Sequence, residues 1–161
     1  MKTILKITIF TAILLIFAGI LVSCEDKEYP IEISFTEYSL VGTACQWTNL
    51  SYDEKIIVIN SNNELRNYIN CSDGDVPPID FLKYTLLIAT GMGSGAICAI
   101  PTAFLQKSKN RYTLEIEVGI GLATAFIRWE ASALVPKISN NIHIALVVQE
   151  TTSSICKHLF E

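Results

Sequence analysis

Apolar and polar residues alternate along most of the second half of the chain, which is the pattern of strands with one buried face. The clearest case is Arg111–Val118, in which every second residue is apolar. Residues two apart share one face of a strand, so this segment is predicted to bury Tyr112, Leu114, Ile116 and Val118 together. Similar patterns predict strands over Ser39–Trp47, Lys55–Asn60, Tyr84–Thr90, Ala96–Gln106, Thr124–Val135 and Ile142–Gln149.

One helix is predicted, directly after the second of these strands. Ser61 followed three residues later by Glu64 forms a capping box, in which each side chain accepts a backbone N–H bond at the start of a helix. The helix is predicted to run over Asn62–Ile69. The loop 71–80 that follows contains Gly74 and two prolines, which prevent the helix from continuing.

The breaks between the later strands predict hairpins. Lys107–Asn110 is typical of a hairpin turn, and Pro101 within its strand predicts a sheet edge or a bulge, because proline has no N–H to donate. The helix and the strands do not alternate regularly, so the predicted fold class is α+β. We expect an antiparallel sheet of five or more strands, curled or doubled into two layers, with one short helix against it.

The first 23 residues have the pattern of a signal peptide. Lys2 and Lys6 precede the apolar segment Ile7–Ile20, which has fourteen residues. A helix that spans a bilayer needs about twenty, whereas this length suits a signal-peptide core. The segment 21–24, LVSC, then resembles the lipobox of bacterial lipoproteins, in which the chain is cut after a small residue and the cysteine thiol takes a diacylglycerol.

This resemblance implies that Cys24 becomes the acylated first residue of the mature chain. Acyl chains would then hold the protein on a membrane without spanning it, and residues 24–37 would be the lipidated cysteine and its tether. The acidic cluster at 25–28 resembles the surface-export signal of Bacteroidota lipoproteins, and an ordinary charged linker is the alternative. The expected location is the cell envelope, lipid-anchored to the outer membrane on its periplasmic or its surface side.

The size and charge of the mature chain fit one acidic domain. Removal of residues 1–23 from the 161-residue chain leaves 138 residues, and we expect 38–161 to form a single α+β domain. The 12 basic residues fall to 10 while all 16 acidic residues stay, so the formal net charge becomes −6. Nucleic acid is therefore not expected as a partner, because phosphate binding needs clustered Lys and Arg.

Four cysteines remain beside Cys24 and are candidates for disulfides: Cys45, Cys71, Cys98 and Cys156. An even number of cysteines in an exported chain favours disulfides, and four allow three connectivities that the sequence does not decide. No pair has the C-x2-4-C spacing of structural zinc sites, so no metal is expected. A free buried thiol is the alternative for Cys98, which lies in the apolar run 96–100.

The sequence offers few side chains for catalysis. His143 lies in a predicted strand and is expected to point outward or to be a satisfied interior residue. Cys156 and His158 are close in sequence, but a cysteine nucleophile and its base require a geometry that sequence proximity does not supply. Glu115 and Glu117 share the polar face of one strand, where two solvated acids are the usual outcome. We therefore expect no enzyme activity and no catalytic residue.

Three further patterns have structural interpretations that we favour. The segment 91–95, GMGSG, resembles a phosphate-binding loop but lacks its Gly-Lys-Ser/Thr ending, and it predicts a hairpin loop with glycines at positive φ. The aspartates in loop 71–80 lack the spacing of a calcium loop and predict a solvated turn. Trp47 and Trp129 can stack on sugars where exposed, and we expect them in the core. No cofactor is expected.

One motif follows the predicted helix and leads into the sheet: Ile79, Asp80, Phe81, Lys83, Leu86, Leu87, Gly91 and Gly95. Together with the helix 62–69, these residues resemble the pattern I-D-F-x-K-y-x-L-L-x-x-x-G-x-x-x-x-G of the C-terminal domain of the PrcB protease-complex family. The similarity covers roughly residues 55–150. The resemblance implies a non-enzymatic domain that acts through protein contacts.

These features predict a lipid-anchored binding or accessory protein of the cell envelope that acts through protein–protein contacts. The membrane and an envelope protein are the expected partners. The alternative is a glycan-binding or hydrolytic envelope lipoprotein, which requires a cleft with convergent carboxylates or aromatic side chains. An exposed apolar patch or an unpaired edge strand would favour the first function.

Overall fold

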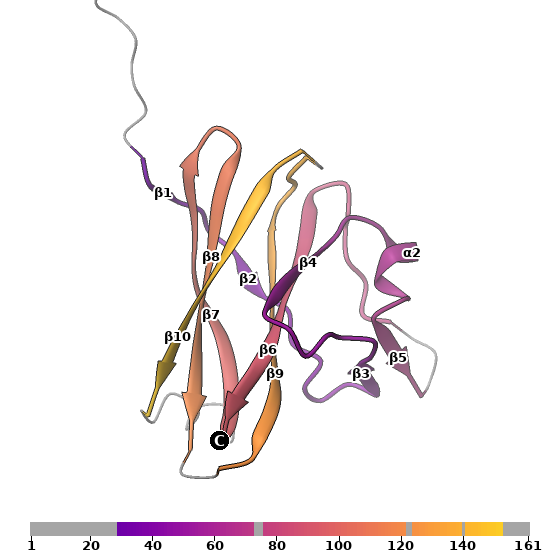
Figure 1. Cartoon of the computed structure of the whole chain (residues 1–161). Coiled ribbons are helices and arrows are strands. Elements are labelled where there is room, and N and C mark those ends of the chain that lie inside the picture. Colours follow the sequence, from indigo (N-terminus) through magenta and orange to yellow (C-terminus); the bar gives the residue numbers. More distant parts are fainter. Residues whose placement is uncertain (1–28, 73–75, 122–123, 140, 153–161) are drawn as a thin grey trace, which may run out of the picture.

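The computed structural model describes residues 29–72, 76–121, 124–139 and 141–152, and these form a β-sandwich with an additional outer layer (Figure 1). The elements, in chain order, are β1 (Ile31–Glu32), β2 (Thr36–Glu37), β3 (Cys45–Trp47), β4 (Lys55–Ile59), α2 (Asn62–Leu65), β5 (Ile69–Cys71), β6 (Tyr84–Ser94), β7 (Ala96–Ser108), β8 (Arg111–Ile120), β9 (Phe126–Pro136) and β10 (His143–Thr151).

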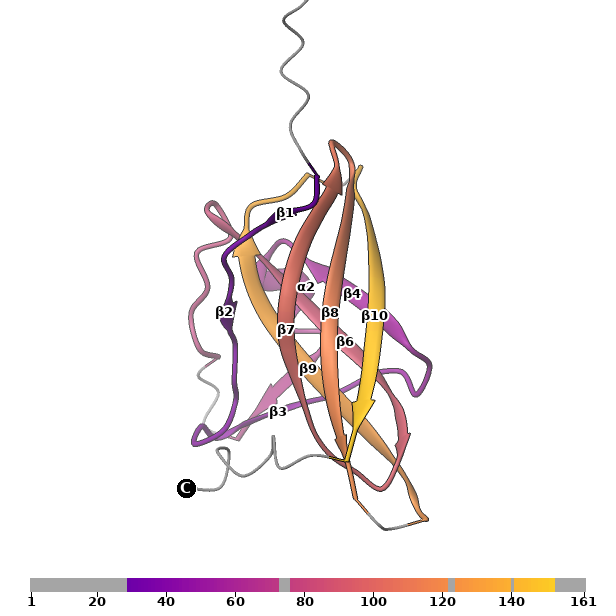
Figure 2. The same ribbon diagram turned by 90° about the vertical axis from the view of Figure 1, so that its left-hand side faces the viewer.

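The strands are arranged in two four-stranded sheets and one small sheet. Sheet A has the order β1-β7-β8-β10, sheet B has the order β2-β9-β6-β4, and β3 pairs with β5. Figure 2 looks onto sheet A, with the two short strands β1 and β2 along one side. The predicted two-layer arrangement of antiparallel strands is therefore present in its main features.

The core lies between sheets A and B. The side chains that face each other there are almost fully buried: Leu87, Ala89, Phe104, Leu114, Ile116, Val118, Trp129, Ala131, Ala133 and Val135. The three residues from β8 confirm the buried face that the alternation predicted for that strand. Trp129 also lies in the core, as expected, with 4% of its surface exposed.

A second apolar cluster covers the other face of sheet B. It joins α2, the small sheet and nearby loops to the strands β4 and β6: Tyr38, Leu50, Ile59, Leu65, Ile69, Ile79, Leu86 and Ile88. Because Leu87 faces one cluster and Leu86 the other, β6 is buried on both sides. This double burial explains the unbroken apolar run of its sequence.

The fold is nearly all β. The predicted α+β class is confirmed only in part, because one short helix is present. That helix ends at Leu65, four residues earlier than predicted. The residues that follow it form β5, in which Ile69 pairs with Trp47 and Cys71 pairs with Cys45. A disulfide also joins Cys45 and Cys71. Pairing with β3 therefore places Ile69 in a strand, although the local pattern assigned it to the helix.

The capping box at the start of α2 is present. Glu64 donates its backbone N–H to Ser61 Oγ at 3.3 Å, and Glu64 Oε2 accepts the backbone N–H of Asn60 at 2.6 Å. The returning bond reaches one residue before the N-cap rather than the N-cap itself. The box therefore fixes the chain between the end of β4 and the first turn of α2.

The strand β10 departs from the fully antiparallel sheet that was predicted, because it runs parallel to β8. The chain leaves sheet B after Pro136 and returns to sheet A at the end where β8 begins, since His143 pairs with Arg111 and donates its N–H to Asn110 O at 3.1 Å. A strand that starts beside the start of β8 must run in the same direction. Thr151, the last residue of β10, consequently lies beside Gly119.

Two of the predicted turn features are confirmed and one is corrected. The β7–β8 ladder shifts register between Pro101 and Ala103, which is the predicted bulge, and Lys109-Asn110 forms the turn after Ser108. The segment 91–95 is not a loop: its first four residues continue β6, and only Gly95 has positive φ, at 61°. Gly91 is in the strand because residues 91–94 pair with 126–129 of β9, and Trp129, the partner of Gly91, leaves no room for a Cβ there.

The folded part begins earlier than predicted. Residues 29–37 were expected to belong to the tether, but they supply β1, which pairs with β7, and β2, which pairs with β9. Residues 1–28, including the predicted signal peptide and Cys24, lie outside the described residues. Within the part of the chain that the structure describes, no helix has the length and apolar character needed to cross a membrane.

Candidate functional site

The outer face of sheet A combines aliphatic side chains with two carboxylates. Leu114, Ile116 and Val118 point into the core, so the alternate residues of β8 point outward. The same alternation turns outward Ala145 and Val147 on β10. Figure 2 shows that no described element lies in front of β7, β8 and β10. Sheet B differs, because α2 and the small sheet cover its outer face.

Strand register arranges this outer face in rows of three residues. The rows are Leu105–Thr113–Ala145, Ala103–Glu115–Val147 and Ile100–Glu117–Gln149. Two carboxylates on the central strand thus lie between mainly aliphatic side chains on both neighbouring strands. Val147 is 40% exposed. Neither carboxylate lies within ion-pair distance of a basic side chain among the described residues.

The free edge of β10 borders this face. β10 pairs with β8 over nine consecutive residue pairs without a register shift, and no described strand pairs with its other edge. Edge strands are usually protected by lysine, proline or a bulge. The sequence of β10, HIALVVQET, contains neither lysine nor proline. Its edge is therefore suited to accept an extended segment of another chain.

A groove of about 490 Å³ lies on a different side of the sandwich. β2 covers the edge of β9 only near Leu134, and β1 covers the edge of β7 only near Gln106, so the rest of this side lacks a strand among the described residues. The groove is lined by Glu37, Tyr38, Ser39, Leu40, Val41, Cys45, Gln46, Trp47, Cys98, Ala99, Arg128, Glu130, Ala131 and Ser132.

The edge of β9 presents backbone groups to this groove. The N–H of Tyr38 bonds to Ser132 O at 3.1 Å, and the Ser132 hydroxyl donates to Tyr38 O. Because backbone groups of alternate residues point the same way, Glu130 and Arg128 turn their N–H and C=O groups toward the same edge. The chain does not follow that edge further, because it turns at 40–43, where Thr43 N–H bonds to Leu40 O and Gly42 has a φ of 80°.

One guanidinium and two carboxylates contribute charge to the groove. Arg128 Nε lies 3.9 Å from Glu130 Oε2, and the Arg128 guanidinium carbon lies 5.8 Å from the ring centre of Tyr52. The Nε atom is buried and has no hydrogen-bond partner among the described residues. Glu37 supplies the second carboxylate. The groove therefore has charged groups of both signs.

Aromatic side chains form one wall of the groove. The rings of Tyr38 and Trp47 are tilted to each other with centres 5.9 Å apart. Tyr38 donates its hydroxyl to Pro77 O at 3.2 Å, and burial raises the pKa of that hydroxyl above its ordinary value. Trp47 is half-buried and was expected in the core, whereas it lines the groove.

Three of the five cysteines that the sequence singled out lie in the described part of the chain, and two lie outside it. Cys45 and Cys71 are joined, which confirms one of the candidate disulfides. Cys98 is also disulfide-bonded, so the free-thiol alternative is wrong. Cys24 and Cys156 lie outside the described residues, and lipidation of Cys24 stays a prediction.

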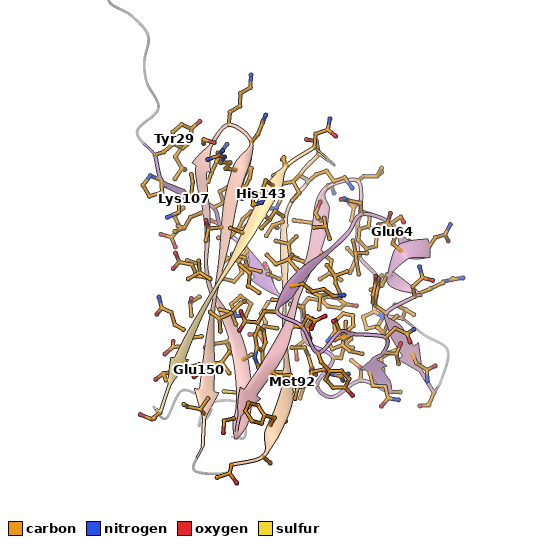
Figure 3. The ribbon with its side chains drawn as sticks, viewed as in Figure 1. Tyr29, Glu64, Met92, Lys107, His143 and Glu150 are labelled. Atoms are coloured by element: carbon orange, nitrogen blue, oxygen red, sulfur yellow. A yellow bond between two sulfur atoms is a disulfide. The ribbon has the colours of Figure 1, made fainter. Side chains whose placement is uncertain are left out.

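The other residues considered for chemistry do not come together. His143 is exposed, lies at the end of the molecule opposite Glu150 (Figure 3), and does not line the groove. Asp80 accepts Leu82 N–H at 3.1 Å and pairs with Lys83 at 3.1 Å, and the bond from the Lys83 ammonium holds the pKa of Asp80 below its usual range. The described residues contain no cluster of three potential metal ligands. His158 and the aspartates at 73 and 75 lie outside the described residues.

Sequence reasoning singled out Cys45, Trp47 and Cys98 but missed the charged residues of the groove. Arg128 and Glu130 alternate with the buried Trp129, and this alternation was a usable sign that both side chains lie on the opposite face of the strand. Tyr52 gave no such sign, because it lies in a loop and reaches Arg128 only through the tertiary fold.

Comparison of the chain with models of known protein families, with characterised proteins and with solved structures found no match. The resemblance to the PrcB C-terminal domain therefore stays a prediction. Several residues of its motif have structural roles here: Leu86 and Leu87 are fully buried, Gly91 lies under Trp129, and Gly95 makes the turn between β6 and β7.

Proposed function

We propose that this chain is a lipid-anchored, non-enzymatic protein of a bacterial cell envelope that binds another envelope protein through sheet A. The observation that carries the proposal is the outer face of sheet A, which no described element covers, together with the adjoining edge of β10, with which no described strand pairs. The resemblance to the PrcB C-terminal domain, which implies function through protein contacts, supports the same conclusion.

The chemistry of the outer face supports a protein partner. Its rows combine aliphatic side chains with Glu115 and Glu117, which form no ion pair with a basic side chain among the described residues. A partner that presents aliphatic side chains and a Lys or Arg would cover the apolar area and pair the carboxylates. The free edge of β10 adds backbone donors and acceptors to the same surface.

The proposed anchor gives this surface a defined orientation. Tyr29, where the described chain begins, lies at the same end of the molecule as Lys107 and His143, whereas Glu150 lies at the opposite end (Figure 3). Only four residues separate Cys24 from Tyr29. The end that also carries Lys109 and Arg111 would therefore stay near the membrane surface, where basic side chains are attracted to anionic lipids. Sheet A would then extend away from the membrane.

A glycan-binding or hydrolytic function is the second candidate, and the groove is the observation that favours it. Trp47 provides an aromatic ring, and Glu37 and Glu130 provide carboxylates, in one cavity. These are the side chains that carbohydrate sites use. Binding of soluble envelope glycans, lost on replacement of Trp47 by alanine, would distinguish this function from binding through sheet A.

The anchor predicts a specific mature N-terminus. Mass spectrometry of the protein isolated from its native membrane should find a chain that begins at Cys24 and carries acyl groups. Treatment with a detergent should be required to release it. An intact Met1, or a Cys24 without lipid, would remove the anchor from the proposal and leave the surface on sheet A to be tested separately.

Photo-cross-linking in intact cells tests the proposed surface. A photoreactive phenylalanine analogue at Val147 should form a covalent product with one envelope protein, whereas the same analogue at Leu82 should not. Leu82 is the matched control because it is 91% exposed and lies away from sheet A, before β6. The substitution E117K should lower the yield at position 147 several-fold by placing a cation where we expect one from the partner. Equal products from both positions, or a yield unaffected by E117K, would contradict the proposal.

A further inference from the structure

We infer that the segment 153–161 of this chain is the occupant of the groove beside β9, held there by a disulfide between Cys98 and Cys156. The inference does not depend on the proposed function, because it is derived from strand register and the reach of the chain. It also bears on the second candidate function, since a filled groove does not admit a glycan.

Only two cysteines can be the disulfide partner of Cys98. The chain has five cysteines, and Cys45 and Cys71 are bonded to each other. Cys98 is disulfide-bonded as well, so its partner is either Cys24 or Cys156, both outside the described residues. The choice between them follows from where the described chain leaves the sandwich at each end.

The end of β10 directs the chain toward Cys98. Thr151 lies beside Gly119, and Gly119 lies beside Cys98, so the three residues form one row across sheet A. Two strand spacings separate Thr151 from Cys98, which is about 10 Å. The five residues from Thr151 to Cys156 reach about 17 Å when extended, so Cys156 can bond to Cys98 without a change in β10.

The beginning of β1 directs the chain away from Cys98. Ile31 pairs with Gln106 and β1 is antiparallel to β7, so residues before Ile31 continue toward Ser108. Figure 3 shows Tyr29 near Lys107, at the opposite end of the sandwich from Glu150. The eight residue-to-residue steps along β7 from Gln106 to Cys98 cover about 26 Å, whereas the seven steps from Ile31 back to Cys24 span at most about 25 Å. Cys156 is therefore the partner that the geometry favours.

The groove has the chemistry to accept residues 157–161. Cys98 itself lines the groove, so a bond to Cys156 delivers the next residues, KHLFE, to its opening. Apolar contacts are available for Leu159 and Phe160 from Leu40, Val41, Trp47, Ala99 and Ala131. Lys157 is complementary to Glu37 or Glu130, and Glu161 is complementary to Arg128. The open edge of β9 offers backbone donors and acceptors to an extended segment.

Formation of the bond is ordinary disulfide chemistry. The Sγ atoms of Cys98 and Cys156 join, each thiol loses its proton, and the two electrons reduce a disulfide of an exchange partner by thiol–disulfide exchange. Oxidation of this kind is available to exported proteins, and Cys45–Cys71 requires the same reaction.

Peptide mapping without reduction tests the bond in the full chain. After free thiols are blocked and the protein is digested, the peptide that contains Cys98 should be linked to the peptide that contains Cys156. A link from Cys98 to Cys24 would overturn the inference, and it would also remove the lipid site. A missing lipid with an intact Cys98–Cys156 link would contradict the proposed anchor alone, so the two failures are distinguishable.

Hydrogen exchange tests the occupancy of the groove. The double substitution L159S/F160S keeps the disulfide and removes the apolar contacts, so the amides of Arg128 and Glu130 should exchange at least ten-fold faster than in the unmodified chain. The amides of Leu114 and Ile116 report whether the sandwich is folded and should be unchanged. S154A serves as the control substitution within the same segment and should leave all four amides unchanged. Unchanged exchange at Arg128 and Glu130 in the double variant would overturn the proposal that this segment fills the groove.

Discussion

Replacement of Gly91 by alanine should lower the free energy of unfolding by about 3 kcal/mol, the upper part of the usual range for overpacking a core. A Cβ built on Gly91 would lie 2.8 Å from Trp129 Cε2 and closer still to Cζ2, with Glu54 Cγ at 3.0 Å on another side. The indole cannot move away easily, because Trp129 is 4% exposed between the two sheets. Urea denaturation followed by circular dichroism measures the loss.

Two further variants separate this steric effect from the ordinary effect of removing a glycine. In G42A the new Cβ has no neighbour within 4 Å, but the residue has a φ of 80°, so only the backbone term of about 1 kcal/mol should appear. In a W129L background, the atoms that obstruct position 91 are gone, and G91A should then lower stability by less than about 1 kcal/mol. If G91A has the same effect in both backgrounds, Trp129 is not the cause.

Removal of the Cys45–Cys71 disulfide should lower the free energy of unfolding by about 3.5 kcal/mol, the loop-closure value for a separation of 26 residues. The two cysteines face each other on β3 and β5, and they hold the small sheet that covers sheet B. The double variant C45A/C71A is suitable because it leaves Cys98 unchanged. The measurement is again urea denaturation, under oxidising conditions.

The neighbouring pair on the same two strands provides the control for the disulfide variant. Gln46 and Asn70 are register partners and both are exposed, so Q46A/N70A changes the same strands without removing a covalent link. Its effect should stay within about 1 kcal/mol, as for most exposed substitutions. An equal effect of the two double variants would show that the covalent link itself contributes little.

Features that depend on neighbouring residues could be predicted from the sequence. The alternation in β8 predicted that Leu114, Ile116 and Val118 share a buried face, because successive side chains of any strand point to opposite sides. Pro101 predicted a sheet edge or a bulge because it lacks an N–H, and a bulge is present there in β7. Ser61 and Glu64 predicted where α2 begins, because both bonds of a capping box lie within one turn.

Features that depend on which segments meet could not be predicted in this way. α2 was predicted to reach Ile69, but pairing with Trp47 places Ile69 in β5. The segment 91–95 was predicted to be a loop, but its first four residues pair with 126–129 of β9 and continue β6. In both cases the deciding partner is distant in sequence, so local propensity carried no information about it.

The candidate sites show the same division. The outward position of Glu115 and Glu117 could be predicted from the sequence alone, since strand alternation is a local property of the backbone. The folded chain was needed to show that mainly aliphatic residues of β7 and β10 flank them, that β10 is an edge strand among the described elements, and that Arg128, Glu130 and Trp47 line one groove. Sheet order and strand direction follow from long-range pairing, and a single sequence specifies that pairing only through the energy of the whole fold.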